Sequence, residues 1–458
     1  MTDQKQPSLR TQIENLKRSF LQFANTPLID ILSTDWLKKL SDSVPCRSDT
    51  IYTPLVVLRL FLLQVLNQDG SCKAAVARFL IERIANGETE VSNSSGPYCV
   101  ARKRLPLDLL MDAVREIAAQ VINLGNMWTW YGYDVYMVDG TTVLLPDTEE
   151  NQDEFPQQKN QKPGLGFPIV RLCALISLAT GTLVDYALAP YEGKGTGETS
   201  LFSRMMGPLN KGSLLLADRY YATFAIITLL FLKDVPVLMI NHAKRIVDYS
   251  TGTVLGKNDH LIEWIKPVIK PIWMTQEDYD KLPNSVIVRE FRVKGIDYVT
   301  TLLDHKKFNK KEMADLYQQR WNVEVDLRSL KTYMGMEMLG CLTPEMIKKE
   351  IAVYFMAYNL IRSIIAQSAI IHEKHPRNIS FAGAVQLIVA GATNMVNMVI
   401  QFTIDMVNII LHAISTNTIG NRKQPTQPRA IKRRPKPYPL LMMPRAEAVE
   451  ILNNQGVT

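Results

Sequence analysis

A short, continuously apolar segment, SLLLAD at residues 213–218, constrains the fold of this chain most strongly. A strand with one face in water alternates apolar and polar residues, whereas an uninterrupted apolar run is typical of a strand buried on both faces. Such a strand needs a helical layer on each side of its sheet, as α/β proteins have. An apolar helical run at 222–232 and a second apolar strand at 235–240 follow directly.

The preceding segments extend this sheet. Residues 133–145, YDVYMVDGTTVLL, are rich in β-branched and aromatic residues and predict a strand. Residues 169–189 predict a hairpin of two strands joined at Thr180–Gly181. With a helix over 197–206, the order is three strands, a helix, a strand, a helix and a strand, which predicts a mixed α/β sheet.

Changes of pattern divide the chain into six regions. Short β-like runs interrupted by Pro, Gly and Lys indicate an insertion in the sheet, and two long helices are expected at 345–374 and 379–413. The expected regions are a helical part at 1–130, the first part of the core at 131–242, a β-rich insertion subdomain at 243–296, the second part of the core at 297–375, a C-terminal helix at 376–414 and a basic Pro-rich tail at 415–458.

Composition argues for a multidomain protein outside the membrane. A chain of 458 residues, 47% of them hydrophobic, can form two or three domains with ample cores. Its five cysteines are scattered singly, which argues against a disulfide framework or a zinc cluster and fits a reducing cytosol. The polar N-terminus shows no signal peptide, and polar residues recur through the apolar segment 381–414. We therefore expect a cytoplasmic protein.

Positive charge is concentrated in the tail, although the net charge of the chain is only +7. No acid occurs from residue 415 to 445, against eight cations: Arg422, Lys423, Arg429, Lys432, Arg433, Arg434, Lys436 and Arg445. Such a segment suits a phosphate backbone. The alternative is a solvated tail without a specific role.

The helical N-terminal region contains a second basic stretch. Ser71 can cap a helix that runs to residue 86, and a polar turn then leads to YCVARKRLP, which holds Arg102, Lys103 and Arg104. A helix, a turn and a short basic helix can form a DNA-reading unit. An ordinary helical bundle with a basic loop fits these residues equally well.

The segment 317–331, YQQRWNVEVDLRSLK, places reactive side chains beside a core stripe. At about 100° per residue, Tyr317, Arg320, Glu324 and Lys331 fall within one narrow sector of a helix. The adjacent sector is apolar and consists of Leu316, Val323, Leu327, Leu330 and Met334. An ordinary solvated face, with Glu324 bridging Arg320 and Arg328, is the alternative.

Two further acids stand on predicted strands. Asp139 interrupts the strand at 133–145, and Asp218 ends the strand at 213–218. Either is a turn or cap residue or a site residue, because sites of α/β sheets lie beyond the carboxyl ends of their strands. If Glu324 joined them, divalent cations would neutralise the three carboxylates, and oxygen ligands suit Mg²⁺, with Mn²⁺ as a possible substitute. Two such ions support phosphoryl transfer, and Arg320 and Lys331 would bind DNA phosphates.

The spacing Y-x2-R-x3-E-x6-K, formed by Tyr317, Arg320, Glu324 and Lys331, resembles the signature of the insertion-sequence-four family of bacterial DDE transposases. The segments VDGTT around Asp139 and LADRYYATF around Asp218 are similar to the other two acidic motifs of that family. The sequence that follows the signature also resembles the family, so the resemblance covers roughly residues 130–375.

The resemblance implies an RNase H-like mixed sheet flanked by helices, with a β-rich insertion between the second acid and the glutamate. It also implies roles for particular residues. The metal-binding triad would be Asp139, Asp218 and Glu324, and the residues contacting DNA near the cleaved phosphate would be Tyr317, Arg320 and Lys331. The family's N-terminal region binds terminal inverted repeats, which favours the DNA-reading interpretation of Arg102, Lys103 and Arg104.

In family members that form hairpin ends, an aromatic residue of the insertion holds a flipped base. Trp273 is the candidate here, with Trp264 behind it, and the alternative is that both tryptophans fill a small β core.

The resemblance thus implies a transposase that excises its own insertion sequence and joins the freed 3′-hydroxyl ends to target DNA. It would need Mg²⁺, act as a homodimer bridging two DNA ends, and work in the bacterial cytoplasm on nucleoid DNA. One alternative is a related RNase H-like nuclease that cuts without strand transfer. The other is a domesticated, inactive DNA-binding regulator.

Overall fold

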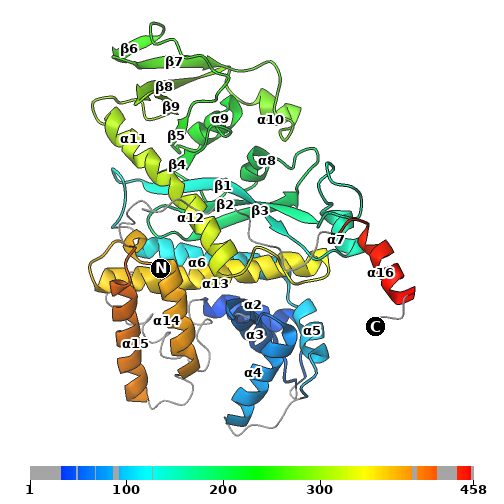
Figure 1. The fold of residues 1–458 in the computed structure, drawn as a ribbon. Coiled ribbons are helices and arrows are strands. Elements are labelled where there is room, and N and C mark those ends of the chain that lie inside the picture. The colour runs from blue at the N-terminus through cyan, green and yellow to red at the C-terminus, as the bar shows by residue number, and fades with distance from the viewer. Residues whose placement is uncertain are drawn as a thin grey trace, which may run out of the picture.

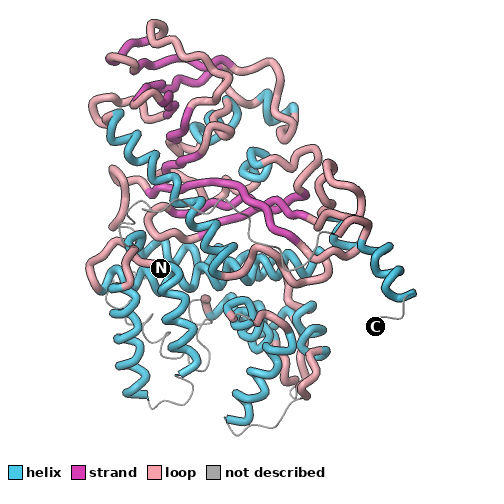
Figure 2. Tube along the Cα trace, viewed as in Figure 1, coloured by secondary structure: helices cyan, strands magenta, loops and turns pink. Residues whose placement is uncertain are grey.

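The computed structural model describes residues 32–47, 50–67, 69–85, 92–125, 127–394, 400–419 and 441–454. One long sheet forms the upper part of the molecule in Figure 1, and helices lie on its faces and below it. Figure 2 separates the strand-rich upper part from the helical lower part by colour.

The first five strands have the order of an RNase H-like core. The strands are β1 (Asp134–Leu144), β2 (Ile169–Ser177), β3 (Leu183–Pro190), β4 (Ser213–Ala217) and β5 (Val237–Ile240). They lie side by side in the order β3-β2-β1-β4-β5. The first three are antiparallel, whereas β1, β4 and β5 are parallel. The mixed α/β sheet expected from the sequence is therefore confirmed.

Strand β4 is buried on both faces, as its composition predicts. Leu214 and Leu216 belong to the core shared with helices α6 (Leu107–Leu124) and α13 (Pro344–Ile371). Leu215 and Ala217 belong to the opposite core, under helices α8 (Glu198–Ser203) and α9 (Phe224–Leu232). The alternation of a strand thus distributes one apolar run between two helical layers.

The insertion continues the same sheet. Its strands are β6 (Thr253–Gly256), β7 (Asp259–Ile265) and β8 (Ser285–Val293), with the short helix α10 (Gln276–Asp280) between β7 and β8. Strand β9 (Ile296–Thr300) pairs with β5 on one side and β8 on the other, so all nine strands form one sheet.

A buried carboxylate ties the insertion to the core. Glu290 of β8 is 2% exposed. Its Oε1 accepts hydrogen bonds from Asn241 Nδ2 at 2.9 Å, Arg245 Nε at 3.0 Å and Trp264 Nε1 at 3.1 Å, and its Oε2 faces His260 Nε2 at 3.1 Å. Because Asn241 directly follows β5, this network fixes the insertion against the end of the core sheet.

The segment of the YREK spacing is helical but irregular. It consists of α11 (Lys310–Gln318), a 3-10 turn (Gln319–Trp321), α12 (Asn322–Arg328) and a π-helical turn (Ser329–Tyr333). The predicted core stripe is confirmed, since five apolar side chains are at most 6% exposed: Leu316, Val323, Leu327, Leu330 and Met334.

Helix α12 is anchored by Asp326, whose side chain is fully buried. Arg377 Nη1 lies 2.8 Å from its Oδ1 and 2.7 Å from its Oδ2, and Arg362 of α13 pairs with the same carboxylate. Arg377 also donates to the carbonyls of Leu178 at 2.6 Å and Ser177 at 2.8 Å. The anchor thus joins α12, α13 and the β2–β3 hairpin.

The helix expected at 379–413 is two helices. Helices α14 (Phe381–Asn394) and α15 (Ile400–Thr416) lie side by side (Figure 1), and Ser380 N donates to Asn417 O at 2.8 Å. The single-helix prediction was wrong because apolar residues recur throughout the segment, and this pattern does not show that its two halves pack against each other.

The N-terminal region is helical, with α2 (Thr34–Ser43), α3 (Pro54–Leu66), α4 (Cys72–Ala85) and α5 (Gly96–Lys103). Ser71 Oγ accepts from Ala74 N at 3.1 Å and caps α4 as expected. At the other end, α16 (Arg445–Asn454) lies within the basic tail and begins at its last cation, whereas the other seven cations, at 422–436, lie outside the described residues. In the part of the chain that is described, no helix combines the length and apolarity needed to cross a membrane.

Candidate active site

Asp139 and Asp218 stand level on two adjacent parallel strands. Strand β1 pairs with β4 as far as Met137 and Leu216, and each acid lies two residues beyond its member of that pair. Met137 and Leu216 both point into the core that α12 also lines. Since side chains two residues apart on a strand share a face, the Asp139 carboxylate is directed toward α12. Asp218 directly follows β4, and its Oδ1 accepts a hydrogen bond from Tyr220 N at 2.7 Å.

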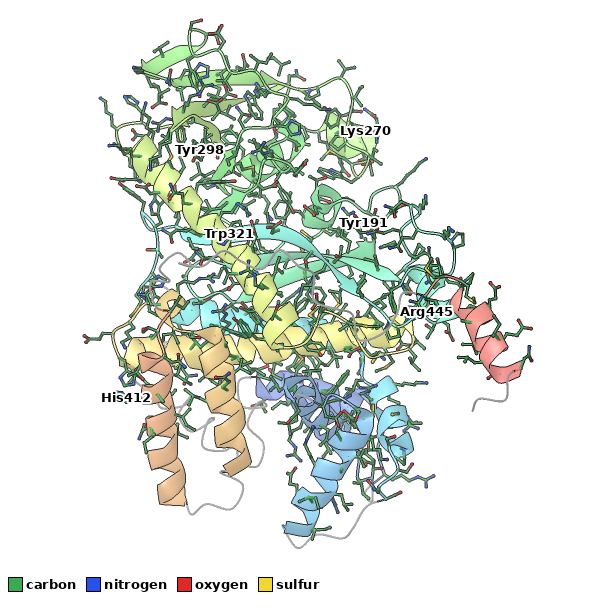
Figure 3. The ribbon with its side chains drawn as sticks, viewed as in Figure 1. Tyr191, Lys270, Tyr298, Trp321, His412 and Arg445 are labelled. Carbon is green, nitrogen blue, oxygen red and sulfur yellow. The ribbon has the colours of Figure 1, made fainter. Side chains whose placement is uncertain are left out.

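Arg320 joins Asp139 to Glu324. Its Nη1 lies 3.3 Å from Asp139 Oδ2, and its Nη2 donates to Glu324 Oε1 at 2.9 Å. Glu324 is in the first turn of α12, which contacts β1. Figure 3 shows this helical run over the sheet at Trp321, the neighbour of Arg320. The fold therefore brings the predicted glutamate to the predicted strand acid.

The electrostatics of Asp139 connect all three acids. Burial raises the pKa of the Asp139 carboxyl, and the negative charges of Asp218 and Glu324 raise it further. The Gly140 N–H, 2.8 Å from Asp139 Oδ1, and the Arg320 guanidinium act in the opposite direction. The raised pKa of Asp139 is thus due chiefly to burial, and the charges of Asp218 and Glu324 act in the same direction.

A fourth carboxylate, Glu198, belongs to this environment and is missing from the sequence prediction. It is in the first turn of α8, on the opposite face of the sheet. A Cβ on Gly140 would lie 2.3 Å from Glu198 Oε1, so the glycine makes room for this carboxylate next to Asp139. Burial raises the pKa of Glu198, and the charges of Asp139 and Asp218 add to that effect.

The residues suit a divalent cation in kind but not in their present arrangement. Carboxylate oxygens are the ligands that Mg²⁺ prefers. Among the described residues, however, no three His, Cys, Asp or Glu side chains are arranged to hold a metal ion. Arg320 forms ion pairs with Asp139 and Glu324, and its positive charge offsets part of the negative charge that a metal ion would neutralise.

The other two residues of the YREK spacing occupy different environments. Lys331 is partly exposed in the π-helical turn. Tyr317 is only 7% exposed and packs edge-on against Tyr298, with ring centroids 5.4 Å apart. Burial raises the pKa of Tyr317 to about 12. The Tyr317 ring thus packs in the core beside the site, and its contact with DNA stays a prediction.

Arg102 is also placed differently from the expectation. Its guanidinium is 4.5 Å from the centre of the Phe61 ring, Nη1 donates to Gln64 Oε1 at 3.2 Å, and the residue is 8% exposed. In this conformation the Arg102 side chain holds α5 against α3, and its contact with DNA stays a prediction. Lys103 and Arg104 are exposed, and their contact with DNA stays a prediction.

The two tryptophans of the insertion differ. Trp264 is 3% exposed, and Arg245 stacks on it with its guanidinium 3.7 Å from the ring centroid, so it is part of the core. Trp273 is partly exposed, and its stacking on a base stays a prediction. Two exposed aromatic residues beside the acids were missed by sequence reasoning: Trp321, 56% exposed next to Arg320, and Tyr220, 64% exposed two residues after Asp218.

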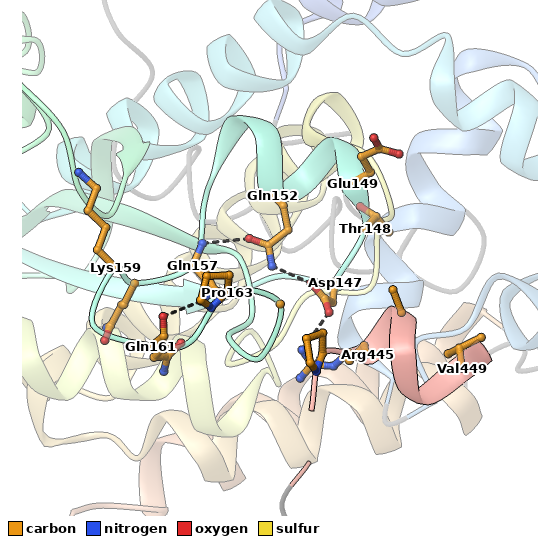
Figure 4. Close-up of a pocket in the computed structure, with 14 residues that line it drawn as sticks. Asp147, Thr148, Glu149, Gln152, Gln157, Lys159, Gln161, Pro163, Arg445 and Val449 are labelled. Atoms are coloured by element: carbon orange, nitrogen blue, oxygen red, sulfur yellow. Dashed lines mark hydrogen bonds and ion pairs between the residues drawn. The ribbon is translucent and has the colours of Figure 1, made fainter. Parts of the chain in front are cut away.

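A cavity of about 820 Å³ lies away from these acids, between α16 and the residues that follow β1. Arg445 Nη1 closes one side through Asp147 Oδ2 at 2.9 Å (Figure 4). None of the three predicted acids lines this cavity.

Sequence comparisons with known proteins cover the part of the chain that forms the core. The family model described as transposase DDE domain matches residues 130–360, half of the chain. Transposase InsG for insertion sequence element IS4 of Escherichia coli K12 is 23% identical over 350 residues, covering 74% of this chain and 76% of InsG. Putative transposase InsZ of the same organism is 22% identical over 170 residues, covering 36% of this chain and 56% of InsZ.

Among solved structures, the piggyBac transposase synaptic complex with hairpin DNA aligns with 89% of this chain and 88% of its own. The TM-score is 0.44 at 9% sequence identity, a similarity too low to establish a shared fold.

Proposed function

The chain belongs to the family of transposases with a DDE domain, and we propose that Asp139, Asp218 and Glu324 are its acidic triad. It is a DNA transposase, similar to that of insertion sequence element IS4. One observation carries the triad proposal: Arg320 contacts Asp139 and Glu324, which lie far apart in the sequence, while Asp218 acts on the pKa of Asp139.

The proposed reaction is phosphodiester cleavage followed by strand transfer. Asp139, Asp218 and Glu324 would hold Mg²⁺, or Mn²⁺ in its place. Bound there, the cation activates the attacking oxygen and stabilises the leaving oxygen. The chain's own contribution is to hold Asp139 in β1, Asp218 directly after β4 and Glu324 on the anchored helix α12, so that ordered elements set the positions of the three carboxylates.

Arg320 and Lys331 are the proposed phosphate contacts of this site, because both are accessible cations on the helical run that carries Glu324. Lys103 and Arg104 are proposed to contact the terminal inverted repeats.

Trp273 is proposed to stack on a base, and a 2-aminopurine probe at the DNA end tests this. Wild-type fluorescence quenching with Trp273→Ala would exclude the contact and direct attention to Trp321.

At the level of the whole reaction, we propose that a homodimer pairs two inverted repeats, excises the element and joins its 3′-hydroxyl ends to target DNA. The protein would act in the bacterial cytoplasm, on nucleoid DNA. These steps go beyond what the fold alone specifies, and they rest on the family and on the IS4 relative.

The test uses a labelled duplex carrying the inverted repeat that bounds the coding sequence, called here the terminal-repeat duplex. Incubation with Mg²⁺ should nick its end, and added plasmid should yield joined products. Nicking without joined products would favour an RNase H-like nuclease. Specific binding without any nicking in Mg²⁺ or Mn²⁺ would favour an inactive regulator and contradict the proposal.

A further inference from the structure

Arg320 occupies the centre of the proposed triad. Its side chain is 15% exposed, and it contacts Asp139, 20% exposed, and Glu324, 32% exposed. The two contacts come from different nitrogens of one guanidinium, so a single planar group holds a strand acid and a helix acid together.

This bridge uses the charge that a divalent cation needs. A guanidinium repels a divalent cation bound to the same carboxylate pair, and Arg320 takes one oxygen of each carboxylate, Asp139 Oδ2 and Glu324 Oε1. In the described part of the chain, the acids do not form a metal-binding group while Arg320 holds two of them.

Arg320 reaches the surface in part. It lies in the 3-10 turn between α11 and α12, none of whose three residues is fully buried, and its side chain is 15% exposed. A DNA phosphate offers a guanidinium the same planar, paired hydrogen bonds that a carboxylate offers. Once Arg320 turns to a phosphate, Asp139 and Glu324 are left close together beside Asp218, and a cation relieves their repulsion.

We propose that Arg320 is a positioning residue that keeps Asp139 and Glu324 together in the absence of DNA. When DNA and metal bind, the Arg320 guanidinium leaves the two carboxylates and pairs with a DNA phosphate. The inference rests on the proposed triad. Its consequence is that DNA and divalent metal bind cooperatively. Couplings between two ligands are typically about 5- to 150-fold and act equally in both directions. The protein without DNA would therefore have a weak metal site.

The experiment is a Mn²⁺ titration followed by electron paramagnetic resonance, with and without the terminal-repeat duplex. The wild type should bind Mn²⁺ at least about fivefold more tightly when DNA is present. Arg320→Ala and the size-matched Arg320→Gln should bind Mn²⁺ more tightly than the wild type without DNA, and DNA should add little. Arg320→Lys keeps a cation but not the fork, and should retain a reduced coupling. Asp139→Asn with the same duplex measures the Mn²⁺ that DNA alone binds.

The outcomes separate this inference from the proposed triad. If wild type and both neutral Arg320 variants bind Mn²⁺ equally well with or without DNA, and Asp139→Asn abolishes that binding, the exchange is wrong and the triad stands. If Asp139→Asn binds as much Mn²⁺ as every other protein, the triad itself is wrong. A melting curve for each variant confirms that the folded protein is titrated.

Discussion

At the scale of single residues, the site depends on contacts between positions that are remote in the sequence. The motif around Asp139 contains Gly140, and no sequence pattern explains a glycine there. The fold does, since Glu198 of a later helix lies where a Cβ of residue 140 would be. Glu198 could not be predicted because its helix is short and its carboxylate meets Asp139 only through tertiary packing.

We predict that Gly140→Ala is destabilising and that Glu198→Ala relieves this cost. The new Cβ has to displace the Glu198 carboxylate, whereas the double variant has room for it. Urea unfolding of the four proteins should give a coupling of roughly 0.5–3 kcal/mol between the two positions. Additive free energies would show that Glu198 does not lie over Gly140.

The raised pKa of Asp139 predicts how stability depends on pH. Because burial and neighbouring acids raise its folded-state pKa, the native state binds the proton more tightly than the unfolded chain. Stability contributed by this group is therefore lost as pH rises from the unfolded pKa, about 4, through the folded one. In EDTA at pH 7, Asp139→Asn should unfold at a higher urea concentration than the wild type.

The advantage of Asp139→Asn should shrink as pH falls below about 4, where the wild-type carboxyl is protonated in both states. A variant that is less stable than the wild type at pH 7, by a margin that grows with pH, would show instead that pairing with Arg320 outweighs burial and repulsion.

At the scale of elements, the helical run that carries Glu324 shows which features helical periodicity in the sequence can predict. A regular helix predicts its buried stripe and the common face of Arg320 and Glu324 correctly, and both are confirmed. It cannot predict the 3-10 and π-helical turns on either side of α12, because an average rotation per residue contains no such breaks. Nor does it give Asp326 a partner, because Arg362 and Arg377 come from later elements.

Removing Asp326 should loosen α12. Asp326→Ala leaves Arg362 and Arg377 without their shared carboxylate in a buried position, and breaking such a pair typically costs about 3–5 kcal/mol. Asp315→Ala is the matched control, since Asp315 is exposed on α11 and its loss should change stability by less than about 0.5 kcal/mol. Equal unfolding midpoints for the two variants would contradict the anchoring role.

At the scale of the whole molecule, the order of strands and helices follows from local patterns, and so does the position of the insertion. Local patterns do not show that the insertion joins the core sheet. The sequence of β9 predicts only a short strand, and its pairing with β5 on one side and β8 on the other appears only in the fold. The same limit explains Arg102, whose basic surroundings indicate DNA whereas its partner Gln64 lies on another helix.

The basic tail should add sequence-independent DNA affinity. Arg445 holds α16 to Asp147, so deletion of the whole tail would also remove a structural interaction. Replacing Lys432, Arg433 and Arg434 by glutamine avoids this. The slope of log affinity against log salt should become shallower by up to roughly 0.9 for each DNA phosphate that the variant no longer neutralises. An unchanged slope would exclude these three cations from DNA binding.

The central claim is that Glu324 completes an acidic triad with Asp139 and Asp218. The most direct measurement is Mg²⁺-dependent nicking of the terminal-repeat duplex by Glu324→Gln, run beside a gel shift in EDTA, with Glu312→Gln on α11 as the matched control. We predict that Glu324→Gln binds DNA at least as tightly as the wild type but nicks it slower by orders of magnitude, while Glu312→Gln behaves like the wild type. Nicking by Glu324→Gln at the wild-type rate would contradict the account and leave Glu324 as an ordinary partner of Arg320.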